Sequence, residues 1–439
     1  MGKPDKKSGK YEKNMDCTTV RNLVAFWLFG LCNNFDYSVM LGAAQDILER
    51  DSEISANSSD ICQEEITSRQ CRSASTGVVL FVETMPALLM KIFTFVLVQQ
   101  LPYGIRHFLT CAAQGAAFVV TARANAVGTA LLGVTLSSIS SGLGDMTYLG
   151  LASHYPRTTI STWSSGTGMA GILGTFSYAA LTDEKFVGFT PTEVILMMFI
   201  VPIVFLFTYY YILVPAPTIP AVSLFRPSSW FLQPAQSLAL GSSTSKKKPG
   251  NMKEKNRKRP NPTVRDQIMA IKSLLKYMIP YGTVYFMQYV ILQGLIEMVI
   301  FDCSHSFDTS TVSQYRWYQV FYHVGVFVAR SSVTFLKLDM FFIYLTALIQ
   351  ALLAGLIFST AVYAFIPHFA AVCALMFLVG VIGGCNYATT YYQIHKKVDP
   401  AIREFALSTV TFADTFGILA AAIVAIPVHR WVCAMHWFA

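Results

Sequence analysis

The sequence predicts an all-α polytopic membrane protein whose helices form two bundles, and three observations lead to this fold class. Hydrophobic residues make up 54% of the 439 residues and charged residues only 13%, about half the ~25% of a typical soluble protein. A soluble fold could not bury so much apolar surface in one core. Apolar runs long enough to cross a membrane recur along the chain, and a polar, basic segment divides them into two groups.

The apolar runs predict eleven transmembrane helices. A crossing helix needs ~20 mostly apolar residues, because lipid offers no partner to an unpaired backbone group. The polar residues 1–21 precede the first run and predict a tail without a cleavable signal peptide. The predicted helices cover residues 22–45, 75–98, 108–122, 126–152, 160–181, 192–214, 275–301, 317–335, 340–362, 368–392 and 404–427.

The distribution of Lys and Arg predicts which side of the membrane each segment faces, because basic residues collect in cytosolic loops. The tail 1–21 is basic, and residues 215–273 carry eleven basic residues against Glu254 and Asp266. Loop 46–74 instead holds seven carboxylates against three arginines. The N-terminus and the 215–273 segment are therefore expected in the cytosol, and loop 46–74 in the lumen.

Loop 46–74 also carries residues that suit a lumenal location. Asn57 begins the only Asn-x-Ser/Thr sequon without proline in the chain, which predicts that Asn57 is glycosylated. Cys62 and Cys71 lie in the same loop, and a lumenal compartment permits a disulfide. The two cysteines are expected to pair with each other and to stabilise the loop by a few kcal/mol at most.

Six predicted helices precede the basic segment and five follow it, which predicts one bundle over residues 22–214 and a second over 274–427. The segment between them, 215–273, is rich in Pro, Ser and Lys and is expected to be a flexible linker. Its basic residues would attract anionic membrane lipids, which are expected partners. Residues 428–439 contain two tryptophans and are expected to form a tail in the membrane interface.

A short internal repeat relates the two halves. Arg157 precedes Gly171-Ile172-Leu173 by fourteen residues, and Arg403 precedes Gly417-Ile418-Leu419 by the same interval. The offset pairs the fifth predicted helix with the eleventh, six helices further along the chain. Parallel six-helix repeats are typical of major-facilitator transporters, so the expected fold is major-facilitator-like.

Polar residues within the predicted helices are the candidate functional residues. An ionisable group at membrane depth costs ~2.5–3.5 kcal/mol on insertion scales, so each such group needs a partner or a function. They either pair internally or line an aqueous cavity. Lys91 lies near the cytosolic end of its predicted helix and is expected to extend its ammonium group to the interface. The candidates for substrate binding or proton coupling are Asp36, Glu83, Asp145, Gln288, Gln293, Glu297, Arg330 and Asp414.

The motifs of soluble enzymes are absent from the chain. It has no Gly-x-Ser-x-Gly elbow, no His-Glu-x-x-His motif, no Walker loop and no Cys-x-x-Cys pair. The eight histidines show no metal-ligand spacing. We therefore expect no catalytic residues, no metal, no cofactor and no nucleic-acid partner.

Eight segments carry a likeness to a known family: Phe26–Phe35, Ser137–Gly144, Trp163–Gly168, Gln314–Gln319, Gly325–Phe327, Arg330–Ser332, Arg403–Ala406 and Asp414–Ile418. In these segments the chain resembles the battenin family of lysosomal and endosomal membrane proteins. The resemblance implies a major-facilitator-like fold in late endosomal or lysosomal membranes. It also implies roles in glycerophosphodiester clearance, lysosomal pH, basic amino-acid transport and membrane trafficking. Gln288 stands where the family is expected to have Glu.

These observations together predict a secondary transporter that exports a small polar metabolite, a glycerophosphodiester or a basic amino acid, from an acidic lumen. Glu83, Glu297 and Asp414 would bind protons or orient the substrate, and Arg330 would attract an anionic group. The alternative is a non-transporting membrane adaptor whose basic segments recruit cytosolic trafficking proteins. An intramembrane lipid enzyme is disfavoured because the nucleophile motifs are missing.

Overall fold

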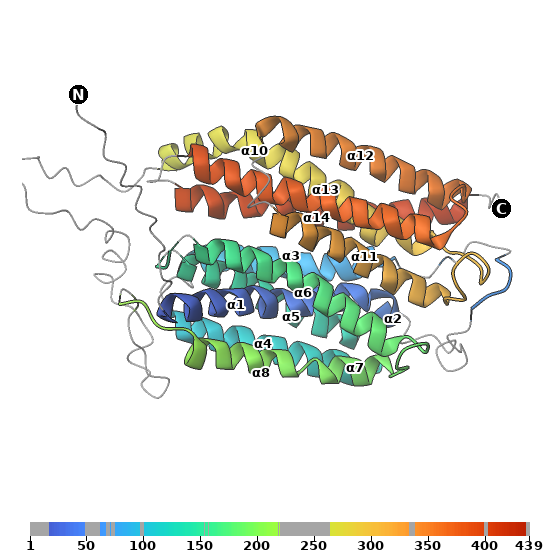
Figure 1. Ribbon diagram of the computed structural model, residues 1–439, viewed down its shortest axis with the longest axis horizontal. Helices are drawn as coiled ribbons and strands as arrows, with labels where there is room; N and C mark the ends of the chain where they lie inside the picture. The colour runs from blue at the N-terminus through green and yellow to red at the C-terminus, as the bar shows by residue number, and fades with distance from the viewer. Residues whose placement is uncertain are drawn as a thin grey trace, which may run out of the picture.

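The computed structural model consists of helices joined by loops and turns, with no strand in the part of the chain that it describes. The helices lie side by side along the long axis of the molecule and form two bundles, one from each half of the chain (Figure 1). The described residues are 17–48, 62–66, 71, 75–96, 101–152, 154–156, 158–217, 219, 264–332, 339–398 and 403–435.

The first bundle has six crossing segments and the second has five, as the sequence predicts. The first bundle consists of α1 (Cys17–Gly42) with the short α2 (Ala44–Leu48), α3 (Gly77–Val96), α4 (Tyr103–Arg123), α5 (Val127–Ala152), α6 (Thr158–Thr182), and a last segment formed by α7 (Pro191–Met197), α8 (Ile200–Phe207) and the π-helical turn η3 (Thr208–Ile212). The second consists of α10 (Val264–Val290) with the turns η5 (Ile291–Leu295) and η6 (Ile296–Met298), α11 (Thr311–Ser332), α12 (Met340–Tyr363), α13 (Phe369–Lys397) and α14 (Arg403–Ala434).

Two boundaries differ from the sequence-based expectation. Helix α10 begins at Val264, inside the range 215–273 that was expected to be linker. Helix α14 continues to Ala434 through Pro427, so residues 428–434 extend the last helix instead of forming a separate tail. Both differences have one cause: hydropathy detects the part of a helix that meets lipid, and not the polar turns that continue beyond it.

Six of the crossing segments are long and apolar enough to span a membrane by length and composition alone, and they lie within 77–94, 127–152, 191–212, 340–363, 369–394 and 409–434. Helices α1, α4, α6, α10 and α11 run alongside them in the same bundles (Figure 1). These five helices bury polar side chains such as Asp36, Gln114 and Gln314. Polar residues that face other helices lower the mean hydropathy without exposing polar groups to lipid.

The two bundles meet mainly through two pairs of helices, α3 with α14 and α6 with α11. The glycines of the internal repeat lie at close helix contacts. A Cβ on Gly171 would collide with the imidazole of His323 on α11, and a Cβ on Gly417 would lie 2.5 Å from the carbonyl oxygen of Gly282 on α10. Glycine therefore leaves room for the His323 side chain at the first position and permits two backbones to approach closely at the second.

Two disulfides join the two halves of the chain. Cys62 is bonded to Cys303 and Cys71 to Cys433, with Cα–Cα distances of 5.5 and 5.9 Å. The predicted Cys62–Cys71 pairing is therefore wrong. Nearness in sequence favoured it, but the fold places residues 62–66 against the second half, where the Cys303 N–H donates a hydrogen bond to the Gln63 carbonyl at 3.0 Å.

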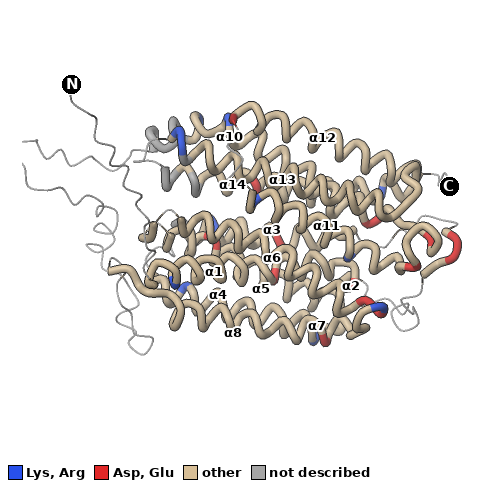
Figure 2. Tube along the Cα trace, in the orientation of Figure 1, with Lys and Arg blue, Asp and Glu red and all other residues tan. Residues whose placement is uncertain are grey.

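Both disulfides lie at the same end of the bundle, which we call the disulfide end. Several acidic residues gather there (Figure 2). Helix α1 begins at the opposite end and α14 ends at the disulfide end (Figure 1), as an odd number of crossings requires. The predicted glycosylation site, Asn57, lies outside the described residues.

The disulfide pairing predicts that the halves stay covalently joined when the chain is cut between them. A recognition site for a specific protease, inserted between residues 240 and 262, would permit this cut in the purified protein. On a denaturing gel the cut protein should run as one species without reductant and as two fragments with it. A variant with Cys303→Ala and Cys433→Ala should give two fragments in both lanes, and wild-type fragments that separate without reductant would contradict the pairing.

Candidate functional site

A cavity of about 600 Å³ lies between the two bundles. Its walls come from α1, α3, α5 and α6 of the first half and from α10, α11, α13 and α14 of the second. Its volume suits a small molecule. The cavity extends from the middle of these helices toward the end at which α1 begins. Tyrosines supply much of the wall, and they include Tyr37, Tyr285, Tyr289, Tyr322, Tyr387 and Tyr391.

The disulfide end of the cavity is closed by contacts between the halves. The hydroxyls of Tyr37 and Tyr289 are 2.8 Å apart, and the hydroxyl of Tyr315 donates to the Leu41 carbonyl at 3.2 Å. Nearer that end, Arg316 on α11 forms a buried ion pair with Asp46 on α2, at 2.7 Å. Within the described part of the chain, these contacts join the two halves on that side of the cavity.

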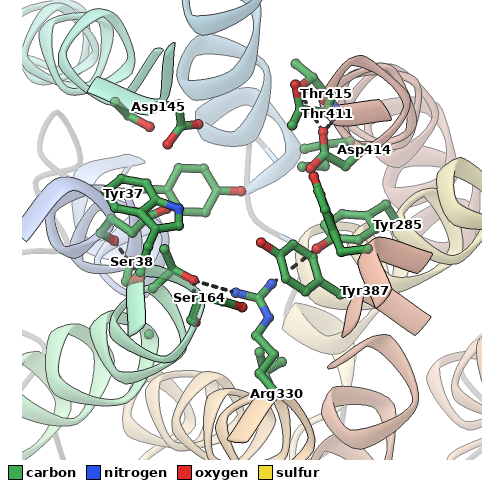
Figure 3. A pocket seen from close by; sticks show the side chains of 18 of the residues that line it. Tyr37, Ser38, Asp145, Ser164, Tyr285, Arg330, Tyr387, Thr411, Asp414 and Thr415 are labelled. Atoms are coloured by element: carbon green, nitrogen blue, oxygen red, sulfur yellow. Dashed lines mark hydrogen bonds between the residues drawn. The ribbon is translucent and has the colours of Figure 1, made fainter. Parts of the chain in front are cut away.

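Four of the predicted candidates line the cavity: Glu83, Asp145, Arg330 and Asp414. They come from both bundles and face one another across the open space, as Figure 3 shows for Asp145, Arg330 and Asp414. The structure thus brings together residues that lie as much as 331 positions apart, from Glu83 to Asp414. Asp36, Gln288, Gln293 and Glu297 are not part of the cavity wall.

Lys91 also lines the cavity, and its predicted position at the membrane interface is wrong. Its side chain is only 10% exposed, and its Nζ lies 3.1 Å from Oδ2 of Asp145 on α5. The same ammonium donates to the Thr415 hydroxyl of α14 at 3.3 Å, across the two bundles. Helix α3 lies at the contact between the bundles. The Lys91 ammonium therefore meets Asp145 within the protein and does not extend to the membrane interface. The sequence spacing could have predicted this position, because Glu83 and Lys91 are eight residues apart and share one helix face.

Arg330 is the cavity cation that no carboxylate neutralises within the described part of the chain. Its guanidinium donates to the hydroxyls of Thr167 at 3.1 Å and Tyr285 at 3.2 Å (Figure 3). It also lies 4.1 Å from the ring centre of Tyr387, a cation–π contact. Asp414, on the opposite wall, accepts a hydrogen bond from the Tyr281 hydroxyl at 3.1 Å. Neutral partners thus hold Arg330 in place and leave its charge available.

Three other candidates make hydrogen bonds to neighbouring segments, Glu297 across the two bundles and Gln293 and Gln288 within the second bundle. Glu297 accepts from the Ser75 hydroxyl at 2.8 Å and from the Thr76 N–H at 3.0 Å, which connects the end of the α10 segment to the start of α3. Gln293 accepts from the Tyr315 hydroxyl at 2.9 Å, and Gln288 donates to the Tyr322 hydroxyl. Their geometry supports a structural role.

The fold and the cavity define a class: a multi-pass membrane protein with a major-facilitator-like fold and a cavity between its two bundles. The D-xylose-proton symporter superposes with a TM-score of 0.59 at 13% identity, over 93% of this chain and 89% of that one. The human organic anion transporter MFSD10 (TETRAN) superposes with a TM-score of 0.54 at 11% identity, over 94% of each chain. At these identities the likeness establishes the fold alone.

Sequence similarity identifies the family. The family model described as "CLN3 protein" matches residues 24–435. Battenin of Canis lupus familiaris is 35% identical over 421 residues, which cover 94% of this chain and 91% of battenin. The protein btn-1 of Neurospora crassa is 30% identical over 441 residues, which cover 93% and 88%. The chain therefore belongs to the CLN3 protein family, the battenin family.

The Lys91–Asp145 pair predicts a charge-dependent loss of stability. Lys91→Met leaves the Asp145 carboxylate without its counter-charge, and breaking a buried ion pair in this way costs about 3–5 kcal/mol. We expect a clearly lower melting temperature for this variant in detergent. The double variant Lys91→Met/Asp145→Asn removes both charges and should recover most of the loss. Losses that simply add in the double variant would contradict the pairing.

Proposed function

We propose that the protein is a secondary transporter that exports a small polar metabolite with an anionic group, of the glycerophosphodiester type, from the lumen of lysosomes or late endosomes. The observation that carries this proposal is the charge of Arg330, which faces the cavity and has hydroxyls, not carboxylates, as its described partners. The guanidinium group matches the geometry of phosphate oxygens.

A basic amino acid is the second candidate substrate, and the cavity favours it less. Its side chain would need an unpaired carboxylate, and Asp145 is already neutralised by Lys91. Asp414 and Glu83 remain as partners for a cation. A phosphodiester would use Arg330 directly and present its hydroxyl groups to the tyrosines of the wall.

In this proposal the end at which α1 begins faces the cytosol and the disulfide end faces the lumen. The basic segments 1–21 and 215–273 support this orientation, and so do the disulfides, which persist in oxidising compartments. The cavity then lies on the cytosolic side of the closed layer, in a state that would release substrate to the cytosol. For the cavity to open to the lumen, the α3–α14 and α6–α11 contacts would have to rearrange.

Flux in proteoliposomes tests this function. Purified protein should move radiolabelled glycerophosphocholine across the membrane, and Arg330→Gln should reduce that flux at least tenfold because the phosphate loses its counter-charge. Arg123→Gln, at the exposed end of α4, is the matched control and should retain flux. Folded wild-type protein that moves neither glycerophosphocholine nor lysine would reject transport and favour the adaptor. Lysine flux that is insensitive to Arg330→Gln would instead assign the amino acid as substrate.

The proposed orientation predicts glycosylation of Asn57. Asn57→Gln should run faster than the wild type on a gel, because it lacks the glycan. Glycosidase treatment should give the wild type the mobility of the variant and leave the variant unchanged. Equal mobility before treatment would argue against a lumenal location of this loop.

A further inference from the structure

Two carboxylates lie next to each other in the interior of the first bundle. Asp36 on α1 is 0% exposed and Glu83 on α3 is 1% exposed. The hydroxyl of Ser137 on α5 donates to Oε1 of Glu83 at 3.0 Å, and the same side chain lies beside Asp36. Gln114 of α4 flanks Asp36 as well. Side chains from four helices thus enclose this pair of acids.

Each acid has an oxygen atom without a hydrogen-bond donor. Oδ2 of Asp36 and Oε2 of Glu83 are buried and accept no hydrogen bond from the described residues. Oδ1 of Asp36 does accept one, from the N–H of Tyr37 at 3.0 Å. Buried carboxylate oxygens normally have partners, because an unpaired charge in a medium of low dielectric constant costs several kcal/mol.

No basic side chain compensates this pair in the described part of the chain. Neither Asp36 nor Glu83 has a Lys, Arg or His nitrogen within 4.0 Å there, whereas Asp145 on the same wall is paired with Lys91. The titratable and charged groups around the pair or further along its helices are Cys32 and Tyr37 of α1, Lys91 of α3, Cys111 of α4, Asp145 of α5, and Tyr289 and Tyr322 of the second half.

We propose that Asp36 and Glu83 together bind one monovalent cation, a proton or a sodium ion, which reaches them from the cavity. Two neighbouring carboxylates cannot both stay charged and unpaired in such a site, so the pair needs one positive charge. Glu83 lines the cavity and gives the cation access, while Asp36 lies behind it. This site deepens the proposed transport function, since it would be the coupling-ion site of that transporter.

The pair is also connected to the contact between the two halves. The residue whose N–H binds Asp36 is Tyr37, and the Tyr37 hydroxyl lies 2.8 Å from the Tyr289 hydroxyl of α10. This tyrosine contact belongs to the layer that closes the cavity. Asp36 and Tyr37 are adjacent in the sequence, so a cation that binds Asp36 changes the charge next to a residue of this closing layer.

Thermal unfolding of the full-length protein in detergent tests the site without any metabolite. A cation that binds the folded state more tightly than the unfolded chain raises the melting temperature. In sodium-free buffer, a proton site predicts a melting temperature that falls by several degrees as pH rises from 5 to 8. A sodium site predicts that, at pH 8, added NaCl raises the melting temperature by several degrees relative to choline chloride.

Amide variants test whether the response of the melting temperature comes from these two acids, because they remove the charge with little change of shape. Asp36→Asn and Glu83→Gln should each abolish most of the response, and the double variant should abolish no more than either alone. The exposed control Glu65→Gln should respond like the wild type. If Asp36→Asn does not fold, Glu83→Gln decides the matter.

Two results would overturn the site: a wild type that responds to neither cation, or folded variants that respond as the wild type does. The readout is independent of flux. A cation response without metabolite flux would support this site and reject the transport proposal. Flux without any cation response would support transport and reject this site.

Discussion

A charge in the interior of a helical membrane protein must find its compensation within the protein, because lipid supplies neither counter-ions nor hydrogen-bond donors. This constraint organises the structure. The Arg316–Asp46 and Lys91–Asp145 pairs satisfy it with opposite charges, and Glu297 satisfies it with hydroxyl and backbone donors. The compensation is incomplete at Arg330 and at the Asp36–Glu83 pair. A solute of opposite charge would complete it.

The distribution of compensated groups explains where the cavity is. At the disulfide end, ion pairs and hydrogen bonds cross from one half to the other and fill the space between them. Toward the start of α1, Lys91 and Arg330 each donate a hydrogen bond to one hydroxyl of the other half. Fewer satisfied contacts between bundles leave room for solvent and for a substrate, so the same polar residues determine both closure and access.

The fold could be predicted from the sequence to a large extent, because hydropathy responds directly to the length of a crossing helix. The eleven segments and the division into two bundles follow from apolar runs and a basic linker. The site was predicted in part: Glu83, Asp145, Arg330 and Asp414 were recognised because charges at membrane depth are rare.

The pairing of residues could not be predicted in the same way. Hydropathy carries no information on which helices become neighbours, so Lys91 was assigned to the interface and Cys62 to Cys71. Their actual partners, Asp145, Cys303 and Cys433, are distant in the sequence and become close only through tertiary packing.

The disulfide connectivity has a consequence for biosynthesis. Cys71 lies before the second predicted helix, and its partner Cys433 lies in the last turns of α14. The thiol of Cys71 must therefore remain reduced, or be held by a temporary partner, while almost the entire chain is synthesised and inserted. Cys62 lies nine residues away and shares the loop during that interval. Correct pairing thus depends on the arrival of the final helix, and a chain truncated before α14 would leave Cys71 without this partner.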